Sequence, residues 1–137
     1  MESGEGKLYK RRGSEGIKTH ISGMGMARVR FPYRSTENGG FDYVYVFEED
    51  GTLKEPEMKE HGEGIYELVS GVYYVVHFSR PNDPSKPITV RYRKMYLSHY
   101  GIFYVQAFED INEDDLPQAV KEKVRVIYNK LAGGEVP

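Results

Sequence analysis

The sequence contains no cysteine, and asparagine and glutamine together supply only six of its 137 residues. The missing thiols exclude disulfides, thiolate metal sites and cysteine nucleophiles, and they make a cytoplasmic location the default expectation. A composition with few Asn and Gln residues and many Glu, Lys, Arg and Tyr residues is typical of thermophile proteins. No run of about 18 apolar residues exists, and the opening MESGEGK lacks the apolar segment of a secretory signal. We therefore expect neither a membrane span nor export.

The motifs of common catalytic and cofactor sites are also missing. The four histidines form no H-x-H, H-x-x-x-H or H-E-x-x-H pair, so a metal site would need distant residues to converge. The glycine pairs at 4–6 and 23–25 lack the spacing or flanking elements of nucleotide loops, and no G-x-S-x-G elbow occurs. The carboxylate runs at 48–50 and 113–115 fall at a predicted turn and at a predicted helix start, where acidic residues are expected to be solvated or favoured by the helix dipole rather than to be catalytic. We predict that the protein is not an enzyme and has no metal or cofactor.

The length suits one domain with a single core. Residues 1–16 are rich in Gly, Glu, Lys and Arg, and they are predicted to form a flexible basic N-terminal arm. This arm could be a solubilising tail or could wrap nucleic acid. Residues 17–137 are predicted to form a single α+β domain.

The stretch from Ile88 to Phe108 predicts the central hairpin of that domain. β-branched and aromatic residues dominate two runs that meet at 98–101, where Gly101 can supply a positive φ. Other runs predict strands at 17–21, 26–33, 41–47, 65–69 and 72–79. The fold class is therefore α+β, with an antiparallel sheet of about five to seven strands packed by a C-terminal helix. The segment 52–64 is expected to be a loop with one helical turn at 57–61.

The strongest helix signal lies between Leu116 and Ala132. Asp115 can cap its start, Gly133-Gly134 can end it, and five apolar residues recur at helical spacing: Leu116, Val120, Val124, Ile127 and Leu131. This stripe is expected to cover the sheet. It could instead form a homodimer contact, although about four turns are short for an independent coiled coil.

Four aromatic residues alternate along the predicted strand 41–47: Phe41, Tyr43, Tyr45 and Phe47. Their common face could pack in the core against a helix or a second sheet. It could also be a platform on which nucleobases stack. Core packing is the favoured interpretation, and the sequence leaves both open.

Charge is segregated along the chain although the net charge is only −2. Residues 1–36 hold 8 basic and 3 acidic residues, and residues 37–70 hold 2 basic and 10 acidic residues. Residues 71–108 are again basic, with 5 cations and 1 carboxylate, and the remainder is acidic. Basic and acidic strands could pair across a sheet. Alternatively, the two basic segments could form one positive surface that meets a polyanion.

Cations and aromatic rings alternate in two of the predicted strands. The candidate nucleic-acid-binding residues are Arg28, Arg30, Phe31, Tyr33 and Arg34 in the first, and Arg91, Tyr92, Arg93, Lys94 and Tyr96 in the second. If the strands are neighbours, these side chains form one groove with charge for phosphates and flat rings for bases. A bulge near Arg93-Lys94 is part of this hypothesis. Strict alternation would otherwise put Met95 and Leu97 on the face of the two arginines.

The predicted function is sequence-tolerant binding of single-stranded nucleic acid, with DNA favoured over RNA, through this basic and aromatic cleft. The alternative is a protein-interaction or viral accessory module whose tyrosine-rich face meets another protein.

The stretches Val29–Arg34 and Val90–Tyr96, read as V-R-F-P-Y-R and V-R-Y-R-K-M-Y, carry a resemblance to a known family. With a small antiparallel sheet, helical cover and a thermophile-like composition, the chain resembles the ThermoDBP-type single-stranded-DNA-binding proteins of hyperthermophilic archaea. The resemblance is one of overall character over residues 17–132, without a diagnostic motif. It implies DNA binding. Family members dimerise through a C-terminal leucine-zipper-like extension, whereas this sequence ends G-G-E-V-P soon after Leu131.

Overall fold

A computed structural model describes residues 16–18, 26–32, 40–59, 63–100 and 103–134. The described residues form eight strands, one 3-10 turn and one α-helix: β1 (Gly16–Lys18), β2 (Ala27–Pro32), β3 (Phe41–Glu48), β4 (Glu57–Lys59), β5 (Glu63–Leu68), β6 (Gly71–Arg80), β7 (Thr89–Tyr100), β8 (Phe103–Ile111), η2 (Glu113–Asp115) and α2 (Gln118–Ala132). The predicted α+β class is confirmed. The predicted basic arm, except for its last residue, lies outside the described residues.

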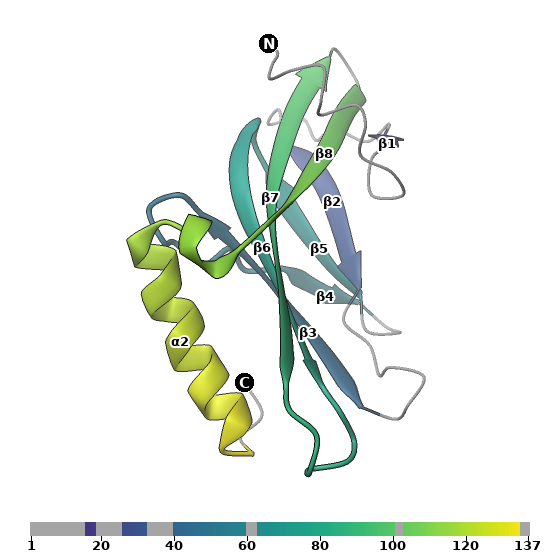
Figure 1. The fold of residues 1–137 in the computed structure, drawn as a ribbon. Helices are drawn as coiled ribbons and strands as arrows, with labels where there is room; N and C mark the ends of the chain where they lie inside the picture. Colours follow the sequence, from purple (N-terminus) through teal and green to yellow (C-terminus); the bar gives the residue numbers. More distant parts are fainter. Residues whose placement is uncertain (1–15, 19–25, 33–39, 60–62, 101–102, 135–137) are drawn as a thin grey trace.

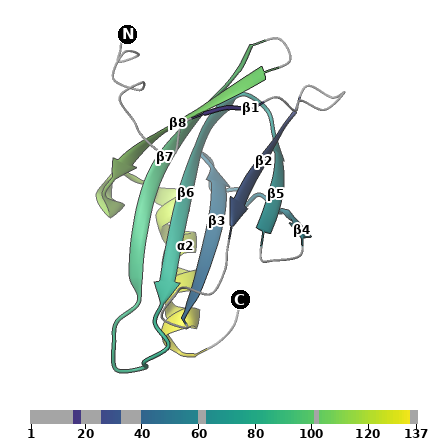
Figure 2. The same ribbon diagram turned by 90° about the vertical axis from the view of Figure 1, so that its right-hand side faces the viewer.

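The strands divide between two antiparallel sheets rather than forming one. The larger sheet has the order β1-β8-β7-β6-β3, and the smaller has the order β2-β5-β4. Figures 1 and 2 show α2 against one face of the larger sheet and β2 and β5 against the other. The domain therefore has three layers, with the larger sheet in the middle.

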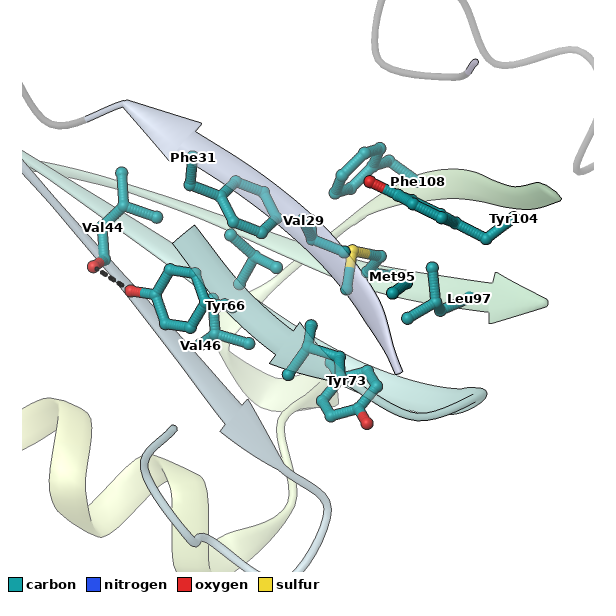
Figure 3. Close-up of a cluster of buried hydrophobic side chains, with 13 residues drawn as sticks. Val29, Phe31, Val44, Val46, Tyr66, Tyr73, Met95, Leu97, Tyr104 and Phe108 are labelled. Carbon is teal, nitrogen blue, oxygen red and sulfur yellow. Dashed lines mark hydrogen bonds between the residues drawn. The ribbon is translucent and has the colours of Figure 1, made fainter. Parts of the chain in front are cut away.

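The first core lies between the two sheets (Figure 3). Alternation along β2 puts Ala27, Val29 and Phe31 on one face, and all three are buried there. Phe31 meets Tyr66 and Phe108 edge to face, with ring centres 5.7 and 6.2 Å apart. The aromatic residues of three strands therefore close this core.

The second core lies between the larger sheet and α2. Val120, Val124 and Leu131 are buried against Phe47, Tyr74, Val76 and Phe78 of the sheet, and Ile127 is partly buried beside them. The apolar stripe of the helix thus covers the sheet, which was the favoured interpretation. The aromatic face of β3 also packs here, with Phe47 fully buried and Tyr43 and Tyr45 half-buried. Phe41, at the end of the strand, is 47% exposed.

Two local predictions were wrong. Glu57–Lys59, expected to begin a helical turn, is strand β4, because it pairs with β5 and that tertiary pairing outweighs local propensity. Asp115 does not cap α2, whose N-cap residue is Pro117. Instead, the Asp115 carboxylate accepts a hydrogen bond from the Asn112 backbone N–H at 3.0 Å and closes η2. Nowhere in the described part of the chain is a helix long and apolar enough to cross a membrane.

Candidate nucleic-acid interface

The second predicted basic strand is continuous. Residues 89–97 of β7 pair with β6, and residues 92–100 pair with β8, each in an unbroken register. The bulge hypothesised near Arg93-Lys94 is therefore absent. Strict alternation then puts Arg91 and Arg93 on the face of Met95, towards the smaller sheet, and Tyr92, Lys94 and Tyr96 on the face towards α2.

The cations of the first predicted strand lie on a different surface. β2 belongs to the smaller sheet and does not pair with β7. Because Val29 and Phe31 fill the core, Arg28 and Arg30 project to the opposite, outer face. Arg28 is paired there with Glu67 at 3.1 Å and Glu57 at 3.4 Å. Tyr33 and Arg34 lie outside the described residues.

Several of the predicted contact residues have partners within the protein. Phe31 is in the core with 5% exposure. Arg91 forms an exposed ion pair with Asp110 at 3.1 Å. The guanidinium carbon of Arg93 lies 4.3 Å from the centre of the Phe108 ring. Those candidate residues that the structure describes are thus distributed over three surfaces and do not form one groove among themselves. Pairing of basic and acidic strands accounts for Arg28 and Arg91.

Lys94 and Tyr96 do meet on the α2 side of the larger sheet. The Lys94 ammonium lies 5.3 Å from the centre of the Tyr96 ring. The Tyr96 hydroxyl donates to Oε1 of Glu109 at 2.9 Å. Burial, followed by that hydrogen bond and the Glu109 charge, raises the pKa of Tyr96 to about 12. Tyr96 is therefore a neutral hydrogen-bond donor at physiological pH, held by a carboxylate that would repel a phosphate.

A different surface combines rings and cations. The loop after β6 and the end of α2 lie at the same end of the molecule (Figures 1 and 2). They border an open hollow of about 500 Å³, which we call the C-terminal hollow. Its lining includes Phe41 of β3, Arg80 of β6, Asn82, Pro84 and Lys86 of the loop, and Tyr128 of α2. Pockets that bury small ligands measure about 300–1,000 Å³, so this hollow is large enough for one.

The lining of the C-terminal hollow is partly fixed in place. Phe41 and Tyr128 expose 47% and 37% of their surface, so part of each residue is accessible to a ligand. Arg80 lies over the Tyr43 ring, 5.6 Å from its centre, and donates to the Tyr43 hydroxyl at 3.2 Å. Next to it, Gly40 is buried so tightly that a Cβ there would clash with the Arg80 carbonyl oxygen. Arg80 is thus held at a defined position before any ligand arrives.

The helix that forms one wall of the hollow is basic. Residues 118–132 contain four cations, Lys121, Lys123, Arg125 and Lys130, and one carboxylate, Glu122. Of the predicted contact residues, Tyr92 of β7 belongs to this side, where it packs against the α2 core. Burial raises the pKa of Tyr92, with smaller contributions from the nearby Glu113 and Tyr128. Tyr92 therefore lies near both Tyr128 of α2 and Glu113 of the acidic η2.

Sequence reasoning missed Arg80, Lys86 and Tyr128. Arg80 ends β6, Lys86 lies in the proline-rich loop that follows, and Tyr128 lies next to the apolar stripe rather than in it. Only the fold brings them beside Phe41. The available signal was that Tyr128 and Arg125 fall off the stripe of a helix expected to cover the sheet, which marks them as surface residues.

The described residues contain no group of three His, Asp or Glu side chains that could hold a metal ion. Comparison of the chain with protein-family models, curated proteins and solved structures found no match in any of the three. The resemblance to ThermoDBP-type proteins stays a prediction.

Proposed function

We propose that the protein binds single-stranded nucleic acid, DNA before RNA, and that the C-terminal hollow is its principal contact. The supporting observation is the presence of two exposed rings, Phe41 and Tyr128, beside two cations, Arg80 and Lys86, in one hollow. Exposed rings provide faces for bases, and cations neutralise phosphates. In a duplex the base faces are already stacked, so a surface of this kind favours single strands.

The basic exposed side of α2 extends the contact. A strand with one base in the hollow can place its next phosphates along Arg125 and Lys121, which lie on successive turns. The acidic turn η2 ends this path, since Glu113, Asp114 and Asp115 repel phosphates. The contact is therefore short, and its affinity depends on only a few phosphates.

The test is fluorescence anisotropy with a labelled oligonucleotide of mixed sequence and a duplex of equal length. We expect the single strand to bind more tightly than the duplex. Its log K should fall linearly with log salt concentration, with a slope of about −0.7 for each phosphate contacted. The absence of single-strand binding at low salt would sink the proposal.

The protein-interaction alternative draws on a separate observation. At the far end of the β7–β8 hairpin, Tyr100 and Phe103 pair across the strands and expose 56% and 42% of their surface. Large exposed rings are typical of protein interfaces. The salt dependence of binding distinguishes the two functions. The affinity of an uncharged aromatic interface changes little with ionic strength, whereas the affinity for phosphates falls steeply as salt rises.

A further inference from the structure

The two cations of the C-terminal hollow are held in different ways. Arg80 is the last residue of β6, and both its backbone and its side chain contact β3. Lys86 lies in the exposed loop that follows, where its backbone N–H donates to the Asp83 carbonyl oxygen at 3.0 Å. Within the described part of the chain, the Lys86 ammonium has no ion-pair or hydrogen-bond partner. Arg80 is therefore oriented by the fold, whereas Lys86 supplies charge on an unrestrained side chain.

Tyr43 of β3 holds the guanidinium of Arg80. Its hydroxyl oxygen accepts a hydrogen bond from Nη2 of Arg80 at 3.2 Å, and the guanidinium carbon lies 5.6 Å from the centre of its ring. Tyr43 is half-buried against the core beneath α2, so the fold fixes its position. It is not one of the described residues that line the hollow. Tyr43 thus orients a cation of the hollow without belonging to the ligand-contacting surface.

The backbone that carries Arg80 is fixed from the same strand. Gly40 directly precedes β3, and a Cβ at this position would clash with the Arg80 carbonyl oxygen and lie 3.0 Å from Cα of Pro81. Both ends of the Arg80 side chain are therefore anchored, the backbone by close packing on Gly40 and the guanidinium by Tyr43. A long side chain that is already ordered loses little further freedom when a ligand binds, so an anchored guanidinium binds a phosphate more tightly than a free one.

We infer that Tyr43 is the positioning residue for the phosphate contact of the C-terminal hollow, through its hold on Arg80. This role rests on the proposed function and names the residue on which the oriented part of the contact depends. Removing the Tyr43 hydroxyl leaves the Arg80 charge in place but loosens the guanidinium. The affinity for a single strand then falls, while the number of phosphates contacted, and with it the salt dependence, stays the same.

The experiment is a double-mutant cycle that measures anisotropy of the labelled single strand with the unmodified protein, Tyr43→Phe, Arg80→Ala and the double variant. Tyr43→Phe should weaken binding about threefold without changing the salt slope. Arg80→Ala should weaken binding more and make the slope shallower by about 0.7, because one phosphate contact is lost. Adding Tyr43→Phe to Arg80→Ala should change the affinity no further, because the cation that Tyr43 holds is gone.

Tyr45→Phe is the matched control. Tyr45 lies on the same face of β3, is also partly buried in the core beneath α2, and is not among the described residues that line the hollow. Its ring packs edge to face on Phe78, with centres 5.7 Å apart, and not on Arg80. This variant removes a hydroxyl from the same strand and should bind the single strand as the unmodified protein does.

The outcomes separate the positioning role from the proposed function. Equal weakening by Tyr43→Phe with and without Arg80 overturns the inference, since the hydroxyl then acts on the hollow as a whole. An unchanged affinity in Tyr43→Phe, or the same loss in Tyr45→Phe, overturns it as well. In each of these cases the unmodified protein still binds, so the proposed function stands. If the unmodified protein does not bind the single strand at low salt, the proposed function fails and the positioning role fails with it.

Discussion

The guanidinium of Arg93 lies over the ring of Phe108, with its central carbon 4.3 Å from the ring centre. Phe108 in turn meets Phe31 across the sheet–sheet core. A cation that the sequence suggested for phosphate binding thus covers the rim of the core. A cation over an aromatic ring contributes about 0.5–2 kcal/mol, depending on how far it is desolvated.

Arg93→Ala should therefore lower the free energy of unfolding by about 1–2 kcal/mol, since it removes both the cation–π contact and the packing of the arginine stem. Arg91→Ala is the matched control, because its ion pair with Asp110 is more than half exposed on both sides. Exposed pairs contribute at most about 1 kcal/mol. Urea unfolding measures both. Equal effects of the two substitutions would contradict the structural role of Arg93.

Tyr128→Ala should weaken oligonucleotide binding about tenfold, because a stacked base contributes roughly 1–3 kcal/mol. Lys86→Ala, in an exposed loop, should weaken binding less but reduce the salt dependence by about one phosphate. Arg91→Ala, on the other face of the larger sheet, should change neither quantity. Anisotropy at several salt concentrations measures all three. If Arg91→Ala has the larger effect, the contact surface lies on β7 and not at the hollow.

Gly51→Ala should destabilise the protein by more than the backbone strain that an alanine with a positive φ would cause by itself. Gly51 has a φ of 92°, and a Cβ there would lie 2.8 Å from the Cβ of Ala119 in α2. Gly134 has a similar φ of 87° and no heavy atom within 4 Å of the added Cβ, so Gly134→Ala reports strain only, about 1 kcal/mol. The difference in melting temperature between the two variants measures how closely the β3 turn packs on the helix. No difference would show that α2 can move away without cost.

Stability should fall as the pH rises from 10 towards 12 because of Tyr96. Its pKa is raised from 10.0 to about 12 in the folded protein, so the unfolded chain loses this proton first and deprotonation favours unfolding. The stabilisation is complete below pH 10 and is lost as the pH passes the folded value. Urea unfolding across this range should show a decline that Tyr96→Phe reduces. Tyr100→Phe, at a ring that is 56% exposed, is the control. An identical decline in both variants would assign the effect to other groups.

Local pattern predicted the elements of the fold well, and tertiary arrangement poorly. Alternation along β2 is enough to identify Ala27, Val29 and Phe31 as residues of one face, because period-2 burial is a property of the strand alone. The apolar stripe of α2 could be predicted for the same reason, because helical spacing is also a local pattern. The division of the strands into two sheets was not predictable, since it depends on which strands pair at long range. That division separates Arg28 from Arg91, and it explains why two similar basic stretches do not form one groove.

The C-terminal hollow could not be predicted from the sequence for the same reason, because it depends on tertiary arrangement. Phe41, Tyr128 and the pair of cations Arg80 and Lys86 come from three separate stretches of the chain, and only Phe41 belongs to a pattern that stands out in the sequence. The aromatic alternation of β3 left core packing and base stacking open, and Phe47, Tyr43 and Tyr45 do pack in the core. The inner three residues of that face are at least partly buried, whereas Phe41, the first residue of β3, is 47% exposed.

The order in which strands join the two sheets has a consequence for how the molecule folds. Along the chain, β1, β3 and β6 to β8 enter the larger sheet, and β2, β4 and β5 enter the smaller one. The backbone therefore crosses between sheets four times, and neither sheet is a continuous piece of sequence. Pairings such as β2 with β5 close long loops, which slows folding. A cut in the turn after β3 would leave both sheets incomplete in either fragment, so we expect the fragments to regain structure only by reassociating.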